Sequence, residues 1–164
     1  MVDSLAHGLW SYIIFRKLKP KKNIKLAILF GVLPDLGSWT IYLFYRLFTN
    51  GFKMGPPDLG RIPDWAFTLY GISHSLVIFS LVALIIYVIF KKIPTYLYAW
   101  PVHILIDIPT HSRSFLPTPF LWPVSDFKFP GIGWGSPFVF FTNYFLIILF
   151  LVYILVFEKR KSKM

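Results

Sequence analysis

The placement of the histidines limits most strongly what this chain can fold into. All four histidines lie within or beside apolar segments of membrane length, and three of them share such segments with two aspartates. The six residues are His7, Asp35, His74, His103, Asp107 and His111. Because hydrocarbon disfavours ionisable groups, such groups inside membrane segments indicate a functional site.

Composition and charge favour one membrane-embedded domain covering residues 1–164. The mean hydropathy is +0.63 and 56% of the residues are hydrophobic, which is unusual for a soluble domain of this length. The net charge of +10 comes from clusters at 16–25, 91–92 and 159–163, each at the edge of an apolar segment. Basic residues at these edges are typical of cytoplasmic loops. We therefore expect the clusters to set the orientation of the membrane segments, and we expect no nucleic-acid partner. The chain has no cysteine, which excludes disulfides and thiolate ligands.

Five helical segments are expected. They are 5–18, 24–48, 64–90, 95–108 and 137–157. With the basic clusters in the cytoplasm, the segments alternate in direction and the basic tail, 158–164, is cytoplasmic. The prediction is an all-α integral membrane bundle of four or five membrane segments, including a short N-terminal helix. That first helix reaches only about 20 Å, against a core of about 30 Å, so whether it spans is left open.

The remaining stretch, 112–136, is predicted to be irregular because prolines and aromatic residues alternate along it. Aromatic residues favour the headgroup zone, so the simplest interpretation is an interfacial anchor. The alternative is a lid over the site, in which Arg113 and Lys128 meet the phosphate of a lipid.

The strongest local motif is His103-x-x-x-Asp107, two side chains one turn apart on one helix face. Such a pair can chelate one metal ion, or the carboxylate can orient the imidazole. Thr110 and His111 follow Pro109, which is expected to turn the chain away, so we assign them to substrate or to ligand support. The alternative is a hydrogen-bonded pair that only ties helices together.

Three further positions are candidate ligands. Pro34 interrupts its segment and can aim Asp35 into a cavity, although a helix kink with a capping Asp35 is the alternative. His74, with Ser75 beside it, is a ligand candidate or a helix–helix hydrogen bond. His7 is a ligand candidate or an interfacial residue.

The candidate ligands fall at similar depths, from the membrane midplane to the outer leaflet. Helix rise places Asp35 roughly 16 Å and His103 about 12 Å from the cytoplasmic edge, with His74 about 15 Å from the outer edge. Histidine and aspartate are ligands of divalent ions; zinc is expected and manganese is the alternative. One catalytic ion or two adjacent ions both fit, and an uncoordinated Asp35 or Asp107 would act as general base.

Taken in order, four motifs resemble the inner-membrane metal-dependent hydrolase family of the YdjM type. They are Ala6-His7, Leu33-Pro34-Asp35, Gly71-Ile72-Ser73-His74-Ser75-Leu76 and His103-x-x-x-Asp107-x-x-Thr110. The resemblance covers roughly positions 6–125, and the ordered set is more specific than any single motif. It implies a multi-span protein of the inner membrane, a hydrolase with phospholipase-like relatives and a divalent metal site. The ligands it implies are His7, Asp35, His74, His103 and Asp107.

The chain also departs from that family's pattern. Gly37 stands where the family often has a second acid, Leu69 and Tyr70 stand in the places of His-Arg, and Ser73 replaces Thr. If the missing groups bind a second metal or a substrate phosphate, this protein holds one metal or is inactive.

The leading expectation is therefore a metal-dependent hydrolase that cleaves a phosphoester of a membrane lipid. One alternative is a transport protein in which the same residues bind a permeating ion or proton. Another is a degenerate, purely structural membrane protein. Membrane lipid is the expected partner, and a homo-oligomer is left open.

Overall fold

The computed structural model describes residues 4–18, 23–51, 55 and 57–161, and within these ranges it is helical and contains no strand. The helices are α1 (Ser4–Leu18), α2 (Ile24–Leu36), α3 (Trp39–Asn50), α4 (Asp64–Ser73), α5 (Leu76–Phe90), α6 (Ala99–Thr110) and α7 (Pro137–Lys161), with the 3-10 turns η1 (Leu59–Arg61) and η2 (Thr95–Tyr98). The all-α prediction is confirmed for the described residues. Parts of two predicted basic clusters, residues 19–22 and 162–164, lie outside the described residues.

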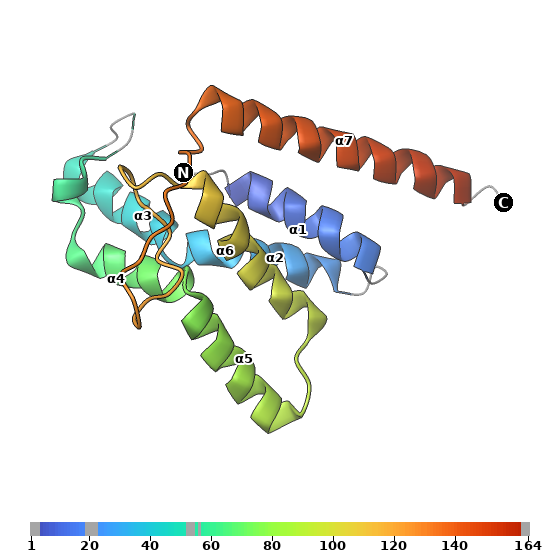
Figure 1. The fold of residues 1–164 in the computed structure, drawn as a ribbon, viewed down its shortest axis with the longest axis horizontal. Helices are drawn as coiled ribbons and strands as arrows, with labels where there is room; N and C mark the ends of the chain where they lie inside the picture. The colour runs from blue at the N-terminus through green and yellow to red at the C-terminus, as the bar shows by residue number, and fades with distance from the viewer. Residues whose placement is uncertain (1–3, 19–22, 52–54, 56, 162–164) are drawn as a thin grey trace.

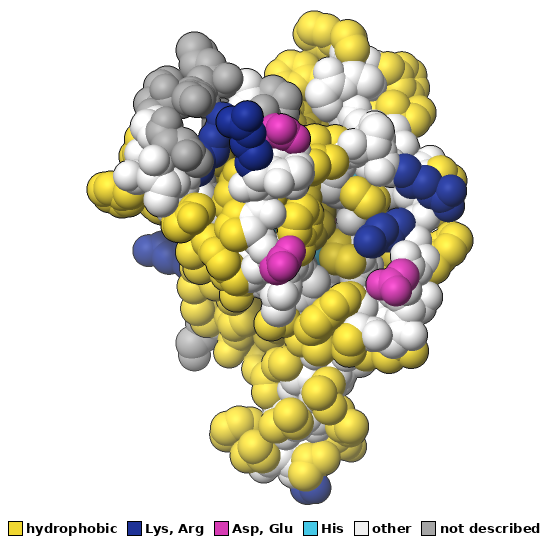
Figure 2. All heavy atoms as spheres, turned by 90° about the vertical axis from the view of Figure 1, so that its left-hand side faces the viewer, with side chains coloured by type: hydrophobic (Ala, Val, Ile, Leu, Met, Phe, Trp, Pro, Cys, Tyr) yellow, Lys and Arg dark blue, Asp and Glu magenta, His cyan; other side chains and the backbone are white. Residues whose placement is uncertain are grey.

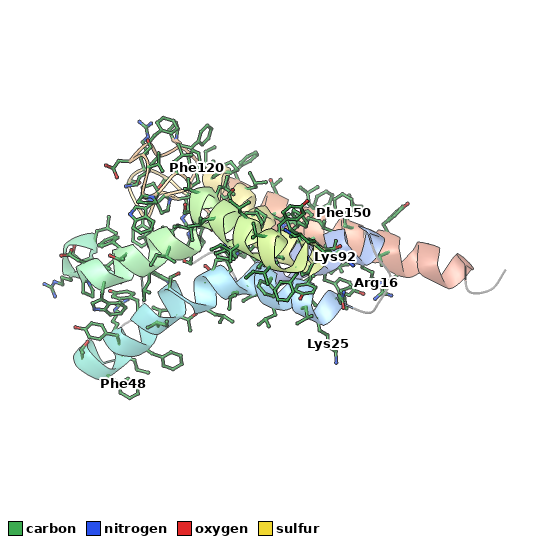
Figure 3. The ribbon with its side chains drawn as sticks, turned by 90° about the horizontal axis from the view of Figure 1, so that it is seen from below. Arg16, Lys25, Phe48, Lys92, Phe120 and Phe150 are labelled. Carbon is green, nitrogen blue, oxygen red and sulfur yellow. The ribbon has the colours of Figure 1, made fainter. Side chains whose placement is uncertain are left out.

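The centre of the molecule is formed by α1, α2 and α6, which pack on one another. Figure 1 shows α7 lying along the outer side of α1, and α5 leaving the bundle on the opposite side. Arg16, Lys25 and Lys92 lie toward one end, and Phe48 and Phe120 lie at the other (Figure 3). With α2–α3 and α4–α5 each taken as one bent segment, successive segments alternate in direction (Figure 1). The labelled basic residues of the first two predicted clusters therefore gather at one end.

The second segment breaks later than the sequence predicted. Pro34 lies inside α2, and the chain bends by 46° at Gly37 and Ser38. The Gly37 N–H donates to the carbonyl of Leu33 (2.8 Å), and the Ser38 hydroxyl donates to that of Pro34 (2.7 Å). These bonds satisfy carbonyls at the end of α2, so α3 leaves in a new direction. Asp35 consequently sits in the last turn of α2.

The continuous helix predicted over 64–90 is instead two helices, α4 and α5, bent by 54° at His74 and Ser75. The Ser75 hydroxyl accepts from the N–H groups of Val77 and Ile78 and so caps α5. The Leu76 N–H donates to the carbonyl of Phe120 (2.9 Å) instead of continuing α4. His74 therefore occupies a corner.

Helix α6 also differs from its prediction, because it continues through Pro109 to Thr110. The His111 N–H donates to the carbonyl of Asp107 (3.0 Å), which extends the helical pattern past the proline. A proline removes only its own backbone donor, and here that loss does not end the last turn. The prediction that Pro109 turns the chain away is wrong.

Residues 112–136 contain no helix or strand, as predicted. Hydrogen bonds join this stretch to the C-terminal end of α6 and to the corner between α4 and α5. The Ile132 N–H donates to the carbonyl of Pro109 (3.0 Å), and the Ser75 hydroxyl donates to the carbonyl of Trp122. Trp122 lies so close to Gly71 that a Cβ there would be 3.0 Å from the indole. This stretch therefore covers the ends of α4 and α6.

The outer faces of α5 and α7 are apolar and exposed. They include Leu84, Ile89, Phe141, Phe145 and Ile148. Within the described residues, one helix is by itself long and apolar enough to cross a membrane, at 137–156. The bent pairs α2–α3 and α4–α5 also pass when each pair is taken as one span.

Candidate metal centre

The six polar residues singled out in the sequence converge on one buried cluster. They come from four parts of the fold: His7 from α1, Asp35 from α2, His74 from the α4–α5 corner, and His103, Asp107 and His111 from α6 and its end. All six are buried, with at most 8% of any residue exposed.

Asp107 is the centre of this cluster. Its Oδ1 lies 3.0 Å from Nε2 of His7 and 3.5 Å from Nε2 of His111. Its Oδ2 lies 3.1 Å from Nε2 of His103 and 3.4 Å from Nε2 of His74. One carboxylate thus faces four imidazoles, each through the same ring nitrogen.

Asp35 lies at the edge of the cluster. Its Oδ1 is 3.6 Å from Nε2 of His74 and 3.8 Å from Nε2 of His103. Its Oδ2 accepts a hydrogen bond from the Ser4 hydroxyl (2.8 Å). Ser4 could not be singled out from the sequence, because a serine at a helix start is usually a cap.

The outer nitrogens of three imidazoles have fixed partners. Nδ1 of His103 lies 2.7 Å from the carbonyl of Gly31, and Nδ1 of His111 lies 2.7 Å from that of Leu116. Nδ1 of His74 lies 2.8 Å from the Ser73 hydroxyl, which itself donates to a carbonyl. A carbonyl can only accept, so each Nδ1 carries the proton. In the neutral rings every Nε2 then turns a lone pair toward the cluster.

This arrangement leaves the inner nitrogens without a donor between them. Nε2 of His74 and Nε2 of His103 are 3.1 Å apart, and two acceptors at that distance need a cation or an added proton between them. Both ring nitrogens of His7 and Oδ1 of Asp107 are buried without a hydrogen-bond partner among the described residues. His7 approaches Asp107 closely, but its ring stacks on His103 (centroids 3.7 Å apart) and points no N–H at the oxygen.

Two overlapping triads have ligand atoms close enough to hold a metal ion. They are His7–Asp35–His103 and His74–His103–Asp107, and the ligand atoms of each lie within 4.8 Å of one another. The buried, unpaired nitrogens and oxygen fit the donor set of a divalent ion. Because both triads use His103, one ion or two adjacent ions remain alternatives.

The predicted supporting residues divide into two groups. His111 joins the cluster, with its Nε2 3.5 Å from Oδ1 of Asp107. Ser75 caps α5, and the Thr110 hydroxyl donates to the carbonyl of Ile106 (2.8 Å). Arg113 is exposed and its Nε donates to the carbonyl of Lys128 (3.1 Å).

Two further residues support the centre. A Cβ at Gly31 would lie 1.9 Å from the Ser11 hydroxyl, so only glycine allows α1 and α2 this close. The Gly31 carbonyl itself lies 2.7 Å from Nδ1 of His103. Tyr70 is buried, with its hydroxyl 3.4 Å from Nδ1 of His111 and 3.3 Å from the carbonyl of Leu116. The departure from the resembled family at Tyr70 thus places a phenol beside the cluster.

Comparisons of this chain with protein-family models, with curated proteins and with solved structures found no match. The resemblance to the YdjM-type hydrolases therefore stays a prediction.

Proposed function

We propose that this protein is a membrane-embedded, divalent-metal-dependent hydrolase that cleaves a phosphoester of a membrane lipid. The observation that carries the proposal is the set of inward-facing Nε2 atoms around Asp107, with His7 and Oδ1 of Asp107 buried and unpaired. His7, His74, His103 and Asp107 would hold the ion, which is zinc or, alternatively, manganese. A divalent ion supplies Lewis-acid polarisation of a phosphoester and acidifies water.

The protein's own residues orient this chemistry. The backbone carbonyls of Gly31 and Leu116 fix the tautomers of His103 and His111. Asp35 is the best candidate for the general base because it lies farther from the imidazoles than Asp107 does. The Ser4 hydroxyl orients its carboxylate and leaves Oδ1 facing the cluster.

A multi-pass position in the inner membrane is part of the proposal. The exposed apolar faces of α5 and α7 suit contact with lipid chains. Arg16, Lys25 and Lys92 gather at one end, which we assign to the cytoplasm together with the basic tail (Figure 3). Helix α1 packs against α2, α6 and α7, so this short helix is shielded by its neighbours. The bundle then has four or five membrane segments.

Elemental analysis tests the metal. Wild-type protein purified in mild detergent without chelator is compared with His103→Ala/Asp107→Ala. Asp126→Asn is the control, because Asp126 is exposed in the stretch 112–136. We expect stoichiometric zinc or manganese in the wild type and in Asp126→Asn, and loss in the double variant. Absence of metal from all three after challenge with zinc would exclude the hydrolase. With metal present, turnover of phospholipids is measured next.

An ion- or proton-transport protein is the second candidate, because an added proton between His74 and His103 would also satisfy their Nε2 atoms. Proteoliposomes separate the two functions. Proton or metal flux that disappears in His103→Ala/Asp107→Ala, without release of phosphate or headgroup from lipid, would support transport. Lipid turnover without flux would support hydrolysis.

A further inference from the structure

A cavity of about 850 Å³ lies between α3 and the stretch 112–136. Its walls include Trp39, Leu43, Arg46, Ser114, Phe115 and Trp134. Its volume is within the range of roughly 300–1,000 Å³ that small-molecule sites occupy. Figure 2 views the molecule from this end, where charged side chains are scattered over a largely apolar surface.

The cavity adjoins the metal centre. A void of about 20 Å³ is lined on its inner side by Asp35, Tyr70 and His111. Three further residues line both this void and the large cavity: Trp39, Phe115 and Trp134. The large cavity is therefore separated from Asp35 and His111, at the edge of the metal centre, by a single layer of aromatic side chains.

The lining indicates the chemistry of the ligand. The aromatic residues and Leu43 offer an apolar wall, and Arg46 contributes a guanidinium group. Guanidinium groups recognise phosphates and carboxylates. A second cavity of about 350 Å³ reaches His7 from the side of α7, and its lining among the described residues includes no lysine or arginine. An anionic ligand thus has its complementary charge in the larger cavity.

We propose that the 850 Å³ cavity is the substrate chamber and that it takes an anionic amphiphile, with Arg46 binding the anionic group and the aromatic wall binding the apolar part. This inference rests on the proposed hydrolase function. Arg46 follows Asp35 by eleven residues of mostly helical chain, which corresponds to roughly 16 Å. A ligand held at Arg46 by its anionic group therefore keeps that group away from the metal centre, and the phosphoester that is cleaved is a second group of the same ligand.

Cysteine protection tests the chamber, because the chain contains no cysteine of its own. Ser114→Cys and Leu43→Cys place single thiols on opposite parts of the wall. Leu81→Cys places one on the exposed face of α5 as the control. The rate of maleimide labelling in detergent is measured with dodecyl phosphate, with dodecanol and without either.

We expect dodecyl phosphate to slow labelling of Ser114→Cys and Leu43→Cys at least fivefold, and to leave Leu81→Cys unchanged. Dodecanol should protect less, and Arg46→Gln should remove the difference between the two amphiphiles. Equal labelling with and without dodecyl phosphate at both chamber positions would overturn the proposal. Equal protection of Leu81→Cys would do the same, because it would show detergent-like coating of the whole surface.

The same labelling in the His103→Ala/Asp107→Ala background separates this inference from the proposed function. If the double variant is still protected and the wild type contains no metal, the cavity binds the amphiphile but the hydrolase is excluded. Metal in the wild type without protection at either position would leave the hydrolase standing and exclude this chamber.

Discussion

Helices α6 and α7 are both predominantly apolar, yet they occupy opposite environments. Helix α7 has 25 residues, and large side chains such as Phe141, Phe145 and Ile148 are exposed along it. Helix α6 has 12 residues, and its His103, Ile104 and Asp107 are almost completely buried. Hydropathy alone ranks α7 as the more membrane-like helix. The polar residues of α6 show instead which helix is enclosed by protein.

The largest mutational effect on the buried helix α6 is expected at Asp107. Asp107→Asn keeps the shape but removes the charge that faces four imidazoles. We expect loss of metal binding and, relative to the metal-loaded wild type, destabilisation by about 3–5 kcal/mol, because a buried cation would lose its carboxylate counter-charge. Metal content and thermal unfolding in detergent measure both effects. Asp126→Asn is the matched control, and an unchanged metal content in Asp107→Asn would contradict the centre as described.

A pair of isoleucines compares the two helices without changing charge. Ile104 is 0% exposed in α6, whereas Ile148 is 59% exposed in α7. Ile104→Ala should destabilise the protein by about 2–5 kcal/mol, because it leaves a cavity at a fully buried position. Ile148→Ala should change stability by less than about 0.5 kcal/mol. Chemical unfolding of the two variants gives the comparison, and similar losses would show that α7 is also covered by protein.

Gly31 tests how closely α1 must approach α2 to support α6. Gly31→Ala places a methyl group against the Ser11 hydroxyl and should cost about 1–3 kcal/mol. The same change in a Ser11→Gly background should be close to neutral, and this double-mutant cycle isolates the contact. Gly60→Ala, whose Cβ would meet only the Asp58 carboxylate at 3.6 Å, is the control. A full cost that persists without Ser11 would refute the steric explanation.

A small effect is expected at the polar contact of α7. The Trp10 indole donates to the Asn143 side chain (2.8 Å), which ties α1 to α7. Hydrogen bonds between membrane helices are worth about 0.6 kcal/mol on average, so Asn143→Leu should lower stability by about that amount and leave metal content unchanged. Thermal unfolding beside metal analysis checks both. Loss of metal in this variant would show that α7 helps to hold the centre.

Much of the candidate site could be predicted from the sequence. The spacing of His103 and Asp107 places both on one helix face, and similar depths relate Asp35 and His74 to that face. The sequence predicts a lesser role for His111, because a proline at position 109 is expected to end the helix. The structure shows the His111 N–H bonded past the proline to Asp107.

Other parts of the site cannot be predicted from the local sequence. The break at His74 depends on the Ser75 cap and on a carbonyl supplied by Phe120 from a distant stretch. The close approach at Gly31 depends on Ser11 in another helix. Such contacts exist only once the tertiary structure has formed, so propensity and periodicity cannot give them.

The order of the ligand residues along the chain has a consequence for biogenesis. His7 lies on α1 and His111 follows α6, whereas α7 contributes none of the six clustered side chains. The donor set is therefore complete once α6 has joined α1 and α2, and it needs no side chain of α7. A divalent ion bound there would hold α1 and α6 together before α7 has packed against them.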